Sequence, residues 1–393
     1  MNILYHHRTR GTGAEGAHIR GIVNALREMG HDVSILSFPG SDPEISLTTS
    51  EGTNVSKENV AVRSIKKISA LTQYVPEVVF ELFELFYNFM AYFRLNNKIK
   101  TNAVELIYER YSLFLFIGVW MARKQGVPII LEVNDSAIVQ RVRPLMFKGI
   151  AAKFEAWIFS RCTGIVFISS HFRDLVQQQY GAIAKSVICP NSADLSVFNY
   201  RKYDKKAIKE ELHLSDKVVC GYVGAFNPWH GIDWFVEIIA PQIKNNPSLV
   251  LLLVGDGICY EFIEDIVHRE KIEDQVILTG KVPHNEVPKY IASMDFGILP
   301  DSNTYGSPMK LFEFMAMKCG MVVPDFSPIV EVVEDKKTSW LFPKKDKEAC
   351  VNLVIEISKN LDQQIEVGNN ARKYIETQRQ WKHNAEFMLT MVE

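Results

Sequence analysis

A lysine and a glutamate lie three residues apart in a stretch of the chain whose central residues are otherwise apolar. The stretch reads NTYGSPMKLFEFMAMKCG, residues 303 to 320, and the charged pair is Lys310 and Glu313. Ser307 followed by Pro308 predicts a helix start, because serine caps free amides and proline has no N–H to lose there. Gly320 is expected to end the helix in a left-handed conformation. A carboxylate inside such an apolar helix is costly to bury unless hydrogen-bond donors reach it.

The first turn of this helix is suited to an anion and a pair of hydroxyl groups. Free amides at a helix N-terminus and the helix dipole favour a phosphate beside Met309 and Lys310. The Glu313 side chain leans back towards that end, since helical side chains point towards the N-terminus. Its carboxylate can accept from two vicinal hydroxyls, so a ribose diphosphate matches both groups. The alternative is that Glu313 is a structural acid bonded to backbone.

A second candidate is the glycine-rich loop GTGAEGAH near the N-terminus. Gly11, Gly13 and Gly16 would let the backbone approach a phosphate or a sugar closely. The loop follows an expected strand and precedes an expected helix, where anions bind. Its spacing differs from the G-x-G-x-x-G dinucleotide pattern with a downstream acid, which argues against a dinucleotide-dependent oxidoreductase.

Composition narrows the class of protein. With 393 residues the chain is long enough for two domains, and its 44 basic residues nearly balance 46 acidic ones. The chain therefore has no excess of positive charge that would favour nucleic acid as a partner. The six cysteines are scattered, without metal-ligand spacing, and we expect reduced, buried thiols in a cytoplasmic protein. No apolar run is long enough to span a membrane.

Strands and helices are expected to alternate along the whole chain, which predicts parallel sheets. The strand candidates of the first half are NILYHH, HDVSILS, LIYERY, PIILEVN, GIVFIS and SVICPN. After a lysine-rich stretch the alternation restarts with KVVCGYVG, SLVLLLVGDG, QVILTG, FGILP and GMVVPD. We expect an α/β protein of two Rossmann-like, doubly wound domains, residues 1–195 and 196–372. Residues 373–393 are expected to form a C-terminal helix that packs back towards the N-terminal domain.

Residues 74–100 interrupt this rhythm with phenylalanines at positions 80, 83, 86, 89 and 93. Their near-threefold spacing predicts an aromatic stripe on a helix, followed by Arg94, Lys98 and Lys100. Two interpretations remain open. The stripe is either part of the core, or an exposed face that docks on a membrane surface or a lipid-linked acceptor.

The motifs, taken in order, resemble those of the family 4 glycosyltransferases of the GT-B fold, also described as glycosyl transferases group 1. The similar stretches include GAEGAHIRGIVNALREMGHDV, GVPIILEVND, VICPNSADLSVF and GYVGAFNPWHGIDWFVE. The most specific is VILTGKVPHNEVPKYIASMDFGILP followed by GSPMKLFEFMAMKCGMVV. The resemblance covers about 350 residues and implies two Rossmann-like domains that face an interdomain cleft.

The resemblance implies roles for individual residues. Glu313 corresponds to the acid that binds the donor ribose, and Gly13 to the glycine near the diphosphate. Gly280, Lys281 and Val282 lie where the family holds the nucleobase. Donor contacts from the segment before and inside the helix are expected at Tyr305, Gly306, Ser307, Pro308, Met309, Lys310 and Leu311. Glu15, His18 and Asp135 are expected on the acceptor side.

The sequence departs from the family pattern at four positions. Tyr305 stands where an acid often contacts the transferred sugar, and Asn134 where a histidine is often found. Ala225 and His230 stand where an arginine and a lysine meet the diphosphate. Lys310 is then the nearest replacement cation, with His230 as a second if it is protonated. We therefore expect Asn134, Lys310 and Glu313 to carry the chemistry.

The resemblance implies a retaining, metal-independent hexosyltransferase that uses a nucleoside-diphosphate sugar as donor substrate and needs no cofactor. No D-x-D motif is present that would hold Mg²⁺ at the phosphates. The acceptor is expected to be a glycan or a lipid-linked sugar in bacterial polysaccharide or glycolipid assembly. The enzyme would be cytoplasmic or peripheral on the inner face of the cell membrane. A non-catalytic nucleotide-sugar-binding subunit and a GT-B-fold epimerase are the alternatives.

Overall fold

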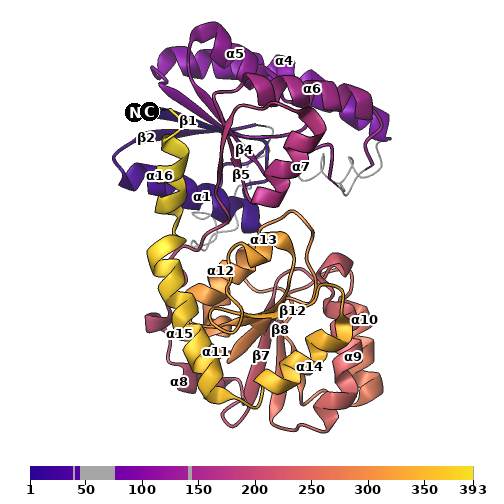
Figure 1. Ribbon diagram of the computed structural model, residues 1–393. Coiled ribbons are helices and arrows are strands. Elements are labelled where there is room, and N and C mark those ends of the chain that lie inside the picture. The colour runs from indigo at the N-terminus through magenta and orange to yellow at the C-terminus, as the bar shows by residue number, and fades with distance from the viewer. Residues whose placement is uncertain (39, 45–75, 140–143, 393) are drawn as a thin grey trace, which may run out of the picture. The chain divides into compact units, whose positions relative to one another are not determined.

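The computed structural model describes residues 1–38, 40–44, 76–139 and 144–392. The chain forms two compact units (Figure 1). The first contains Met1–Cys189 and Asn384–Glu393, and the second contains Pro190–His383. Each unit has one parallel six-stranded sheet with helices around it, so the predicted doubly wound α/β architecture is confirmed.

The sheet of the first unit has the strand order β2-β1-β3-β4-β5-β6. The strands are β1 (Asn2–His7), β2 (Asp32–Ser37), β3 (Leu106–Arg110), β4 (Ile129–Val133), β5 (Gly164–Phe167) and β6 (Lys185–Ile188). In the central strands β3, β4 and β5 every residue except Arg110 is buried, as expected for strands covered on both faces. The order reverses between β1 and β3, and the carboxyl ends of these strands are where open α/β sheets bind ligands.

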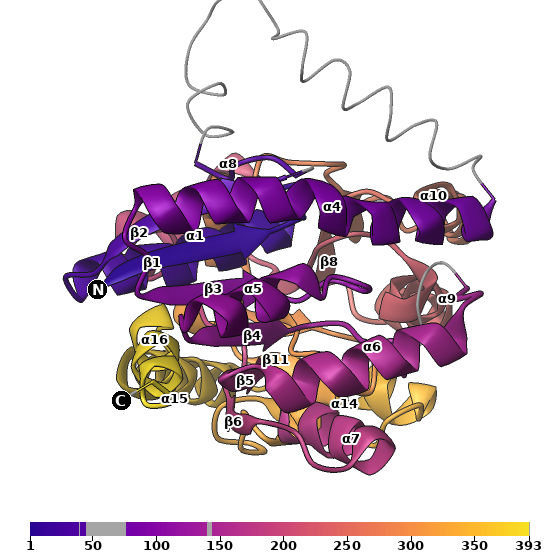
Figure 2. The same ribbon diagram turned by 90° about the horizontal axis from the view of Figure 1, so that it is seen from above.

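The helices of the first unit are α1 (Gly13–Glu28), α4 (Glu77–Thr101), α5 (Ile117–Gln125), α6 (Lys148–Arg161) and α7 (Ser170–Tyr180). Right-handed crossovers place α1 on one face of the sheet and α4 to α6 on the other, as Figures 1 and 2 show. Part of α16 (Trp381–Leu389) also belongs to this unit. No helix among the described residues is long and apolar enough to cross a membrane.

The sheet of the second unit has the order β12-β11-β10-β7-β8-β9. Its strands are β7 (Val218–Val223), β8 (Leu249–Val254), β9 (Val276–Leu278), β10 (Phe296–Ile298), β11 (Met321–Pro324) and β12 (Trp340–Phe342). The last of these, at the edge of the sheet, is absent from the predicted set. The order reverses between β7 and β10, which makes the carboxyl ends of these two strands the expected ligand edge.

The helices of the second unit surround its sheet. They are α8 (Lys205–Glu211), α9 (Ile232–Lys244), α10 (Tyr260–Glu270), α11 (Val287–Ser293), α12 (Met309–Ala316), α13 (Ser327–Val330), α14 (Lys347–Ile357) and α15 (Leu361–Gln378), with short 3-10 turns at Tyr200–Lys202 and Pro228–His230. Two apolar clusters form the core, one from α9, α10 and α14 and the other including α12 and α15. All six cysteines of the chain are buried free thiols.

The aromatic stripe lies on α4, which begins at Glu77, while residues 74 and 75 are outside the described part of the chain. Phe83, Phe86, Phe89 and Phe93 are 55–61% exposed. The interpretation of the stripe as core is therefore wrong for these four rings. The buried side of α4 is formed instead by Glu81, Tyr87, Asn88, Ala91, Leu95 and Ile99.

The C-terminal segment contributes to the core of the first unit. Met388 is fully buried, and the side chain of Met391 lies so close to Gly164 of β5 that an added Cβ there would be 2.6 Å from its sulfur. Lys185 Nζ donates to the carbonyl of Thr390 at 2.8 Å. The segment therefore closes a gap beside β5 and β6 with buried side chains.

Met388→Ala should lower the free energy of unfolding by about 2 to 4 kcal/mol, because it leaves a cavity in this contact. Phe387→Ala is the matched control on the same helix. Its ring is 53% exposed, and its loss should cost less than about 0.5 kcal/mol. Urea denaturation of both variants checks the difference. Equal losses would contradict the assignment of residues 384–393 to the core of the first unit.

Candidate functional site

The carboxyl edge of the second sheet is formed by glycine backbones in close contact. The Gly255 amide donates to the carbonyl of Gly280 at 3.0 Å, so the loops after β8 and β9 meet. A Cβ on Gly255 would lie 1.9 Å from the carbonyl oxygen of Gly224, which follows β7. Gly280 has a φ of +68° and open space around its Cα. The loops that follow three adjacent strands thus present bare backbone at one edge.

Helix α12 begins at this edge and carries Lys310 and Glu313. It runs from Met309 to Ala316, with Pro308 as N-cap and no described side chain capping its amides. The predicted cap at Ser307 is therefore wrong by one position. The Ser307 hydroxyl instead accepts from the Asn191 amide at 3.0 Å, which fixes the segment before the helix. The uncapped amides of Met309 and Lys310 remain in the first turn.

The end of α12 also differs from the prediction. Lys318, with a φ of +60°, takes the left-handed position, and Gly320 does not. Gly320 serves close packing, since a Cβ there would lie 2.6 Å from Val367 and 2.9 Å from Trp340. The left-handed residue that ends α12 is therefore Lys318, two positions before the predicted Gly320.

The Lys310 ammonium group is held against Tyr222, at the end of β7. It donates to the Tyr222 hydroxyl at 2.9 Å and lies 4.2 Å from the ring centroid. The same hydroxyl donates to the carbonyl of Ala225 at 2.9 Å. Burial lowers the pKa of Lys310 to about 7, although Glu313 nearby acts to raise it. Tyr222 thus connects the lysine to the predicted donor position at Ala225.

Gly224 gives the lysine its space. A Cβ at Gly224 would lie 2.9 Å from Lys310 Nζ. Any larger residue there would displace the ammonium group.

His230 lies beside the same lysine but is not a cation at neutral pH. Burial, and then the positive charge of Lys310, lowers the pKa of His230 to about 3. His230 could supply positive charge only if it were protonated, and this pKa keeps the ring neutral near pH 7 in the ligand-free protein. Its ring Nδ1 is buried and has no hydrogen-bond partner among the described residues. The neutral ring can still donate or accept a hydrogen bond.

The Glu313 carboxylate has a weak polar partner. Residue Glu313 is only 7% exposed, and His284 Nε2 lies 3.4 Å from Oε1, at the limit of a hydrogen bond. His284 was not among the predicted site residues, although it stands in the quoted stretch GKVPHNEVP. Its ring packs edge-on against Phe198 at 5.7 Å. The carboxylate therefore retains acceptor capacity towards further donors.

The remaining predicted donor residues differ in whether their side chains or amides can contact a ligand. Tyr305 and Gly306 form a turn in which both amides donate to the Asn303 side chain. Leu311 is fully buried and its amide donates to the Pro308 carbonyl, so it can only support the helix. Lys281 is exposed and Val282 packs partly into the core.

In the first unit, the predicted residues surround a buried carboxylate that was not predicted. Glu132, on β4, accepts from Asn134 Nδ2 at 2.5 Å and from the Tyr5 hydroxyl at 3.2 Å. It also pairs with His18 Nε2 at 3.0 Å and with Arg110. Burial alone would raise the pKa of Glu132, but His18 and Arg110 hold it well below its usual range.

The other residues of the first unit lie nearby or on the glycine loop. Glu15 is exposed, and its negative charge favours the charged form of Arg110. Asp135 accepts from the Ser136 amide at 2.8 Å. Gly11 and Gly16 are required by packing, because a Cβ on either would lie within 2.3 Å of a backbone oxygen. Gly13, with a φ of +59°, has open space instead.

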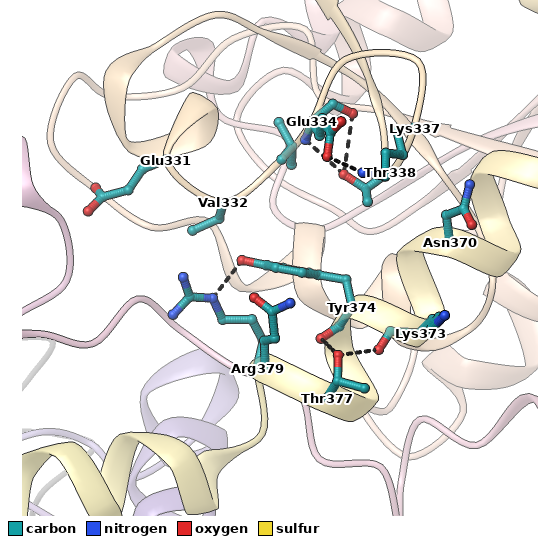
Figure 3. Close-up of a pocket in the computed structure, with 12 residues that line it drawn as sticks. Glu331, Val332, Glu334, Lys337, Thr338, Asn370, Lys373, Tyr374, Thr377 and Arg379 are labelled. Atoms are coloured by element: carbon teal, nitrogen blue, oxygen red, sulfur yellow. Dashed lines mark hydrogen bonds and ion pairs between the residues drawn. The ribbon is translucent and has the colours of Figure 1, made fainter.

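A surface pocket in the second unit is separate from these residues. It has a volume of about 460 Å³ and lies between α15 and the loop after α13 (Figure 3). Its polar groups pair with one another, as Lys337 does with Glu334 and Arg379 with Tyr374. None of the predicted site residues lines it. Among the described residues, no cluster of His, Cys, Asp or Glu side chains is arranged to hold a metal.

Known proteins match both units. Residues 16–197 match the family model described as Glycosyltransferase Family 4, and residues 217–360 match Glycosyl transferases group 1. Alpha-D-kanosaminyltransferase of Streptomyces kanamyceticus is 21% identical over 57% of this chain and 59% of its own length. A GDP-mannose-dependent alpha-(1-6)-phosphatidylinositol monomannoside mannosyltransferase of Mycobacterium tuberculosis is 20% identical over 55% of this chain. That alignment covers 58% of the relative, so this chain spans less than two thirds of both proteins.

The fold has close counterparts among solved structures. The crystal structure of Anabaena Alr3699/HepE in complex with UDP superimposes with a TM-score of 0.74, at 14% identity, over 100% of this chain and 99% of that one. At this identity the likeness concerns the fold. Since the two family models together match most of the chain, with residues from both units, the chain belongs to the group 1, family 4 glycosyltransferases, and its two parallel sheets have the GT-B fold.

Proposed function

We propose that this glycosyltransferase moves a sugar from a nucleoside-diphosphate sugar to an acceptor hydroxyl with retention of configuration. The observation that carries this proposal is the placement of the Glu313 carboxylate and the Lys310 ammonium group at one edge of the second sheet. The carboxylate would bind hydroxyl groups and the ammonium group would bind phosphate. A nucleoside diphosphate contains both kinds of group.

Glu313 would bind the two ribose hydroxyls. Its weak contact with His284, at 3.4 Å, leaves lone pairs for two strong charge-assisted hydrogen bonds. His284 would then lie beside the ribose and could donate to it directly. The bare backbone around Gly280 would accept the base, with UDP and GDP sugars as the candidates. HepE was crystallised with UDP, and the mycobacterial relative is named for GDP-mannose.

Lys310 would neutralise the diphosphate together with the amides of Met309 and Lys310 itself. A phosphate beside the ammonium group raises its pKa, because an opposite charge favours the protonated form. His230, which is neutral, would donate one hydrogen bond to a phosphate oxygen. These groups stabilise the negative charge that develops on the leaving diphosphate, where electrostatic stabilisation contributes most. The leaving phosphate would take the acceptor proton, so no protein nucleophile is required.

The first unit would bind the acceptor. Glu15 and Asp135 offer carboxylate oxygens to acceptor hydroxyls, and Gly13 offers an open backbone. His18 and Asn134 would act through Glu132, since both side chains bond its carboxylate. The acceptor class we propose is a glycan or glycolipid, by analogy with the relative that acts on a phosphatidylinositol mannoside.

Glu313→Gln should weaken nucleoside-diphosphate binding at least about tenfold, since a charged acceptor contributes about 1.5 to 3 kcal/mol per hydrogen bond. The melting temperature of the empty protein should be unchanged or raised, because the carboxylate is nearly buried with one weak partner. Titration calorimetry with UDP and GDP measures the affinity. Tyr305→Phe is the control, and it should leave nucleoside-diphosphate binding unchanged. Normal binding by Glu313→Gln with early unfolding would make the acid structural.

Lys310→Met should stabilise the empty protein at pH 7. The pKa of Lys310 is about 7 when folded against 10.5 in a model compound, so the unfolded chain binds its proton more tightly. The charged lysine therefore lowers the free energy of unfolding. This destabilisation is fully present below pH 7 and disappears as the pH rises towards 10.5. The gain should be about 1 to 3 kcal/mol at pH 7, after allowance for partial exposure, and smaller near pH 10.

Urea denaturation at both pH values measures this gain. Lys359→Met, a change at an exposed lysine, should alter neither value. A Lys310→Met variant that is less stable at pH 7 than the parent would show that the ammonium group stabilises the fold.

Sugar transfer should survive excess chelator, because Lys310 and the helix amides supply the positive charge that a divalent cation would otherwise provide. A loss of more than about tenfold, or roughly 1.4 kcal/mol in the barrier, restored by Mg²⁺ or Mn²⁺, would refute this assignment of the leaving-group charge.

A further inference from the structure

The first unit exposes a continuous apolar ridge on α4. The ridge consists of large side chains on one side of the helix, Val78, Val79, Leu82, Phe83, Phe86, Phe89, Met90 and Phe93. Trp120 of α5 extends the ridge onto the neighbouring helix. Its ring centroid lies 6.2 Å from that of Tyr92. Met146, just before α6, and Ile150, in its first turn, are also exposed, and the bond from the Met146 amide to Glu81 holds this segment beside α4. An exposed apolar surface of this extent is characteristic of an interaction site.

Polar side chains on the opposite side of α4 force the ridge outward. Glu81 accepts from the amides of Met146 and Phe147 at 2.6 and 2.9 Å, and so fixes the segment that leads into α6. Asn88 accepts from the amides of Phe116 and Ile117, both at 3.1 Å, and donates to the carbonyl of Phe114 at 2.8 Å. Rolling α4 to bury the phenylalanines would break these buried hydrogen bonds. The exposure is therefore built into the helix.

The charges around the ridge are of one sign. The exposed ionisable side chains of α4, α5 and α6 are all basic, namely Arg94, Lys100, Arg123, Lys124, Lys148, Lys153 and Arg161. The carboxylates of these three helices are withdrawn from the surface: Glu81 and Glu155 are buried, while Glu77 and Glu84 are half-buried. The chain as a whole has a formal net charge of −2, so this basic face is a local property.

The basic residues also lie where an amphipathic surface needs them. Helices α4 and α5 lead into the parallel strands β3 and β4, so their C-termini lie at the same end of the unit. Arg94 and Lys100 of α4 and Arg123 and Lys124 of α5 therefore flank one end of the ridge. Lys124 Nζ lies over the Trp120 ring, 4.9 Å from its centroid. Long basic side chains around exposed rings match lipid phosphates above an acyl layer.

We propose that the α4–α6 face docks on an anionic lipid surface, with the ridge entering the interface and the basic residues contacting lipid phosphates. Apolar burial and attraction to anionic lipids add in such binding. The helix lies along the surface, since no described helix is suited to span a bilayer. This inference does not depend on the identity of the sugar donor. It would keep the enzyme beside a membrane-anchored acceptor.

The test is co-sedimentation of the full chain with phosphatidylcholine vesicles, with and without about 30 mol% phosphatidylglycerol, at low and high salt. The wild type should bind the anionic vesicles at least about tenfold more tightly than the neutral ones, and salt should weaken this binding. Phe86→Ser with Phe89→Ser should reduce binding at least about tenfold at unchanged melting temperature, because both rings are about 60% exposed. Phe262→Ser, at a ring 46% exposed on α10, is the matched control and should bind as the wild type does.

Three results would overturn the assignment. The first is a wild type that binds neither kind of vesicle, and the second is equal binding to neutral and anionic vesicles at every salt concentration. Sedimentation velocity without lipid could instead show a dimer that the double variant dissociates, and the ridge would then belong to an interface between two copies. Arg123→Glu with Lys124→Glu separates the charge contribution, and should weaken binding to anionic vesicles while leaving the melting temperature unchanged.

Discussion

The confinement of the Lys310 ammonium group against Tyr222 determines what the carboxyl edge of the second sheet can bind. An ammonium group is stable in water and costly to remove from it, and here burial brings its pKa down to about 7. Tyr222 offers it one hydroxyl, and Gly224 leaves room for its head group. A group held in this way gains most from a ligand that brings negative charge. Phosphate is such a ligand, and the uncapped first turn of α12 favours it further.

The buried carboxylates of the two units, Glu132 and Glu313, have different numbers of hydrogen-bond donors around them. This difference indicates which carboxylate has a structural role and which can bind a ligand. Glu132 is surrounded by the donors of His18, Arg110, Asn134 and Tyr5, so its charge is compensated within the protein. Within the described part of the chain, the Glu313 carboxylate has one hydrogen-bond partner, His284 at 3.4 Å, with the Lys310 charge nearby. A compensated buried charge fixes local structure, whereas an under-compensated one has capacity for a ligand. Glu313 is therefore the better candidate for direct contact with substrate, and Glu132 for positioning the residues around it.

Periodicity and strand–loop–helix order were enough to predict both sheets, because apolar strands flanked by amphipathic helices have few alternative packings. Three-dimensional contacts decided the rest. The role of Gly320 depends on Trp340 and Val367, and Glu132 became recognisable only when β1, β3 and α1 met around it. The short edge strand β12 has too few residues for a clear alternation. The exposure of the α4 phenylalanines follows from Glu81 and Asn88, whose partners lie far along the chain.

The most direct measurement of the central claim is proton uptake on nucleotide binding. Calorimetric titration of UDP and GDP at pH 8, in buffers of different ionisation enthalpy, gives the number of protons bound per complex. With a pKa of about 7, Lys310 is mostly neutral at pH 8 in the empty protein, and a diphosphate would restore its charge. We expect uptake approaching one proton per nucleotide, abolished in Lys310→Met. Tight nucleotide binding without proton uptake, or uptake that persists in Lys310→Met, would contradict the assignment of Lys310 to the diphosphate.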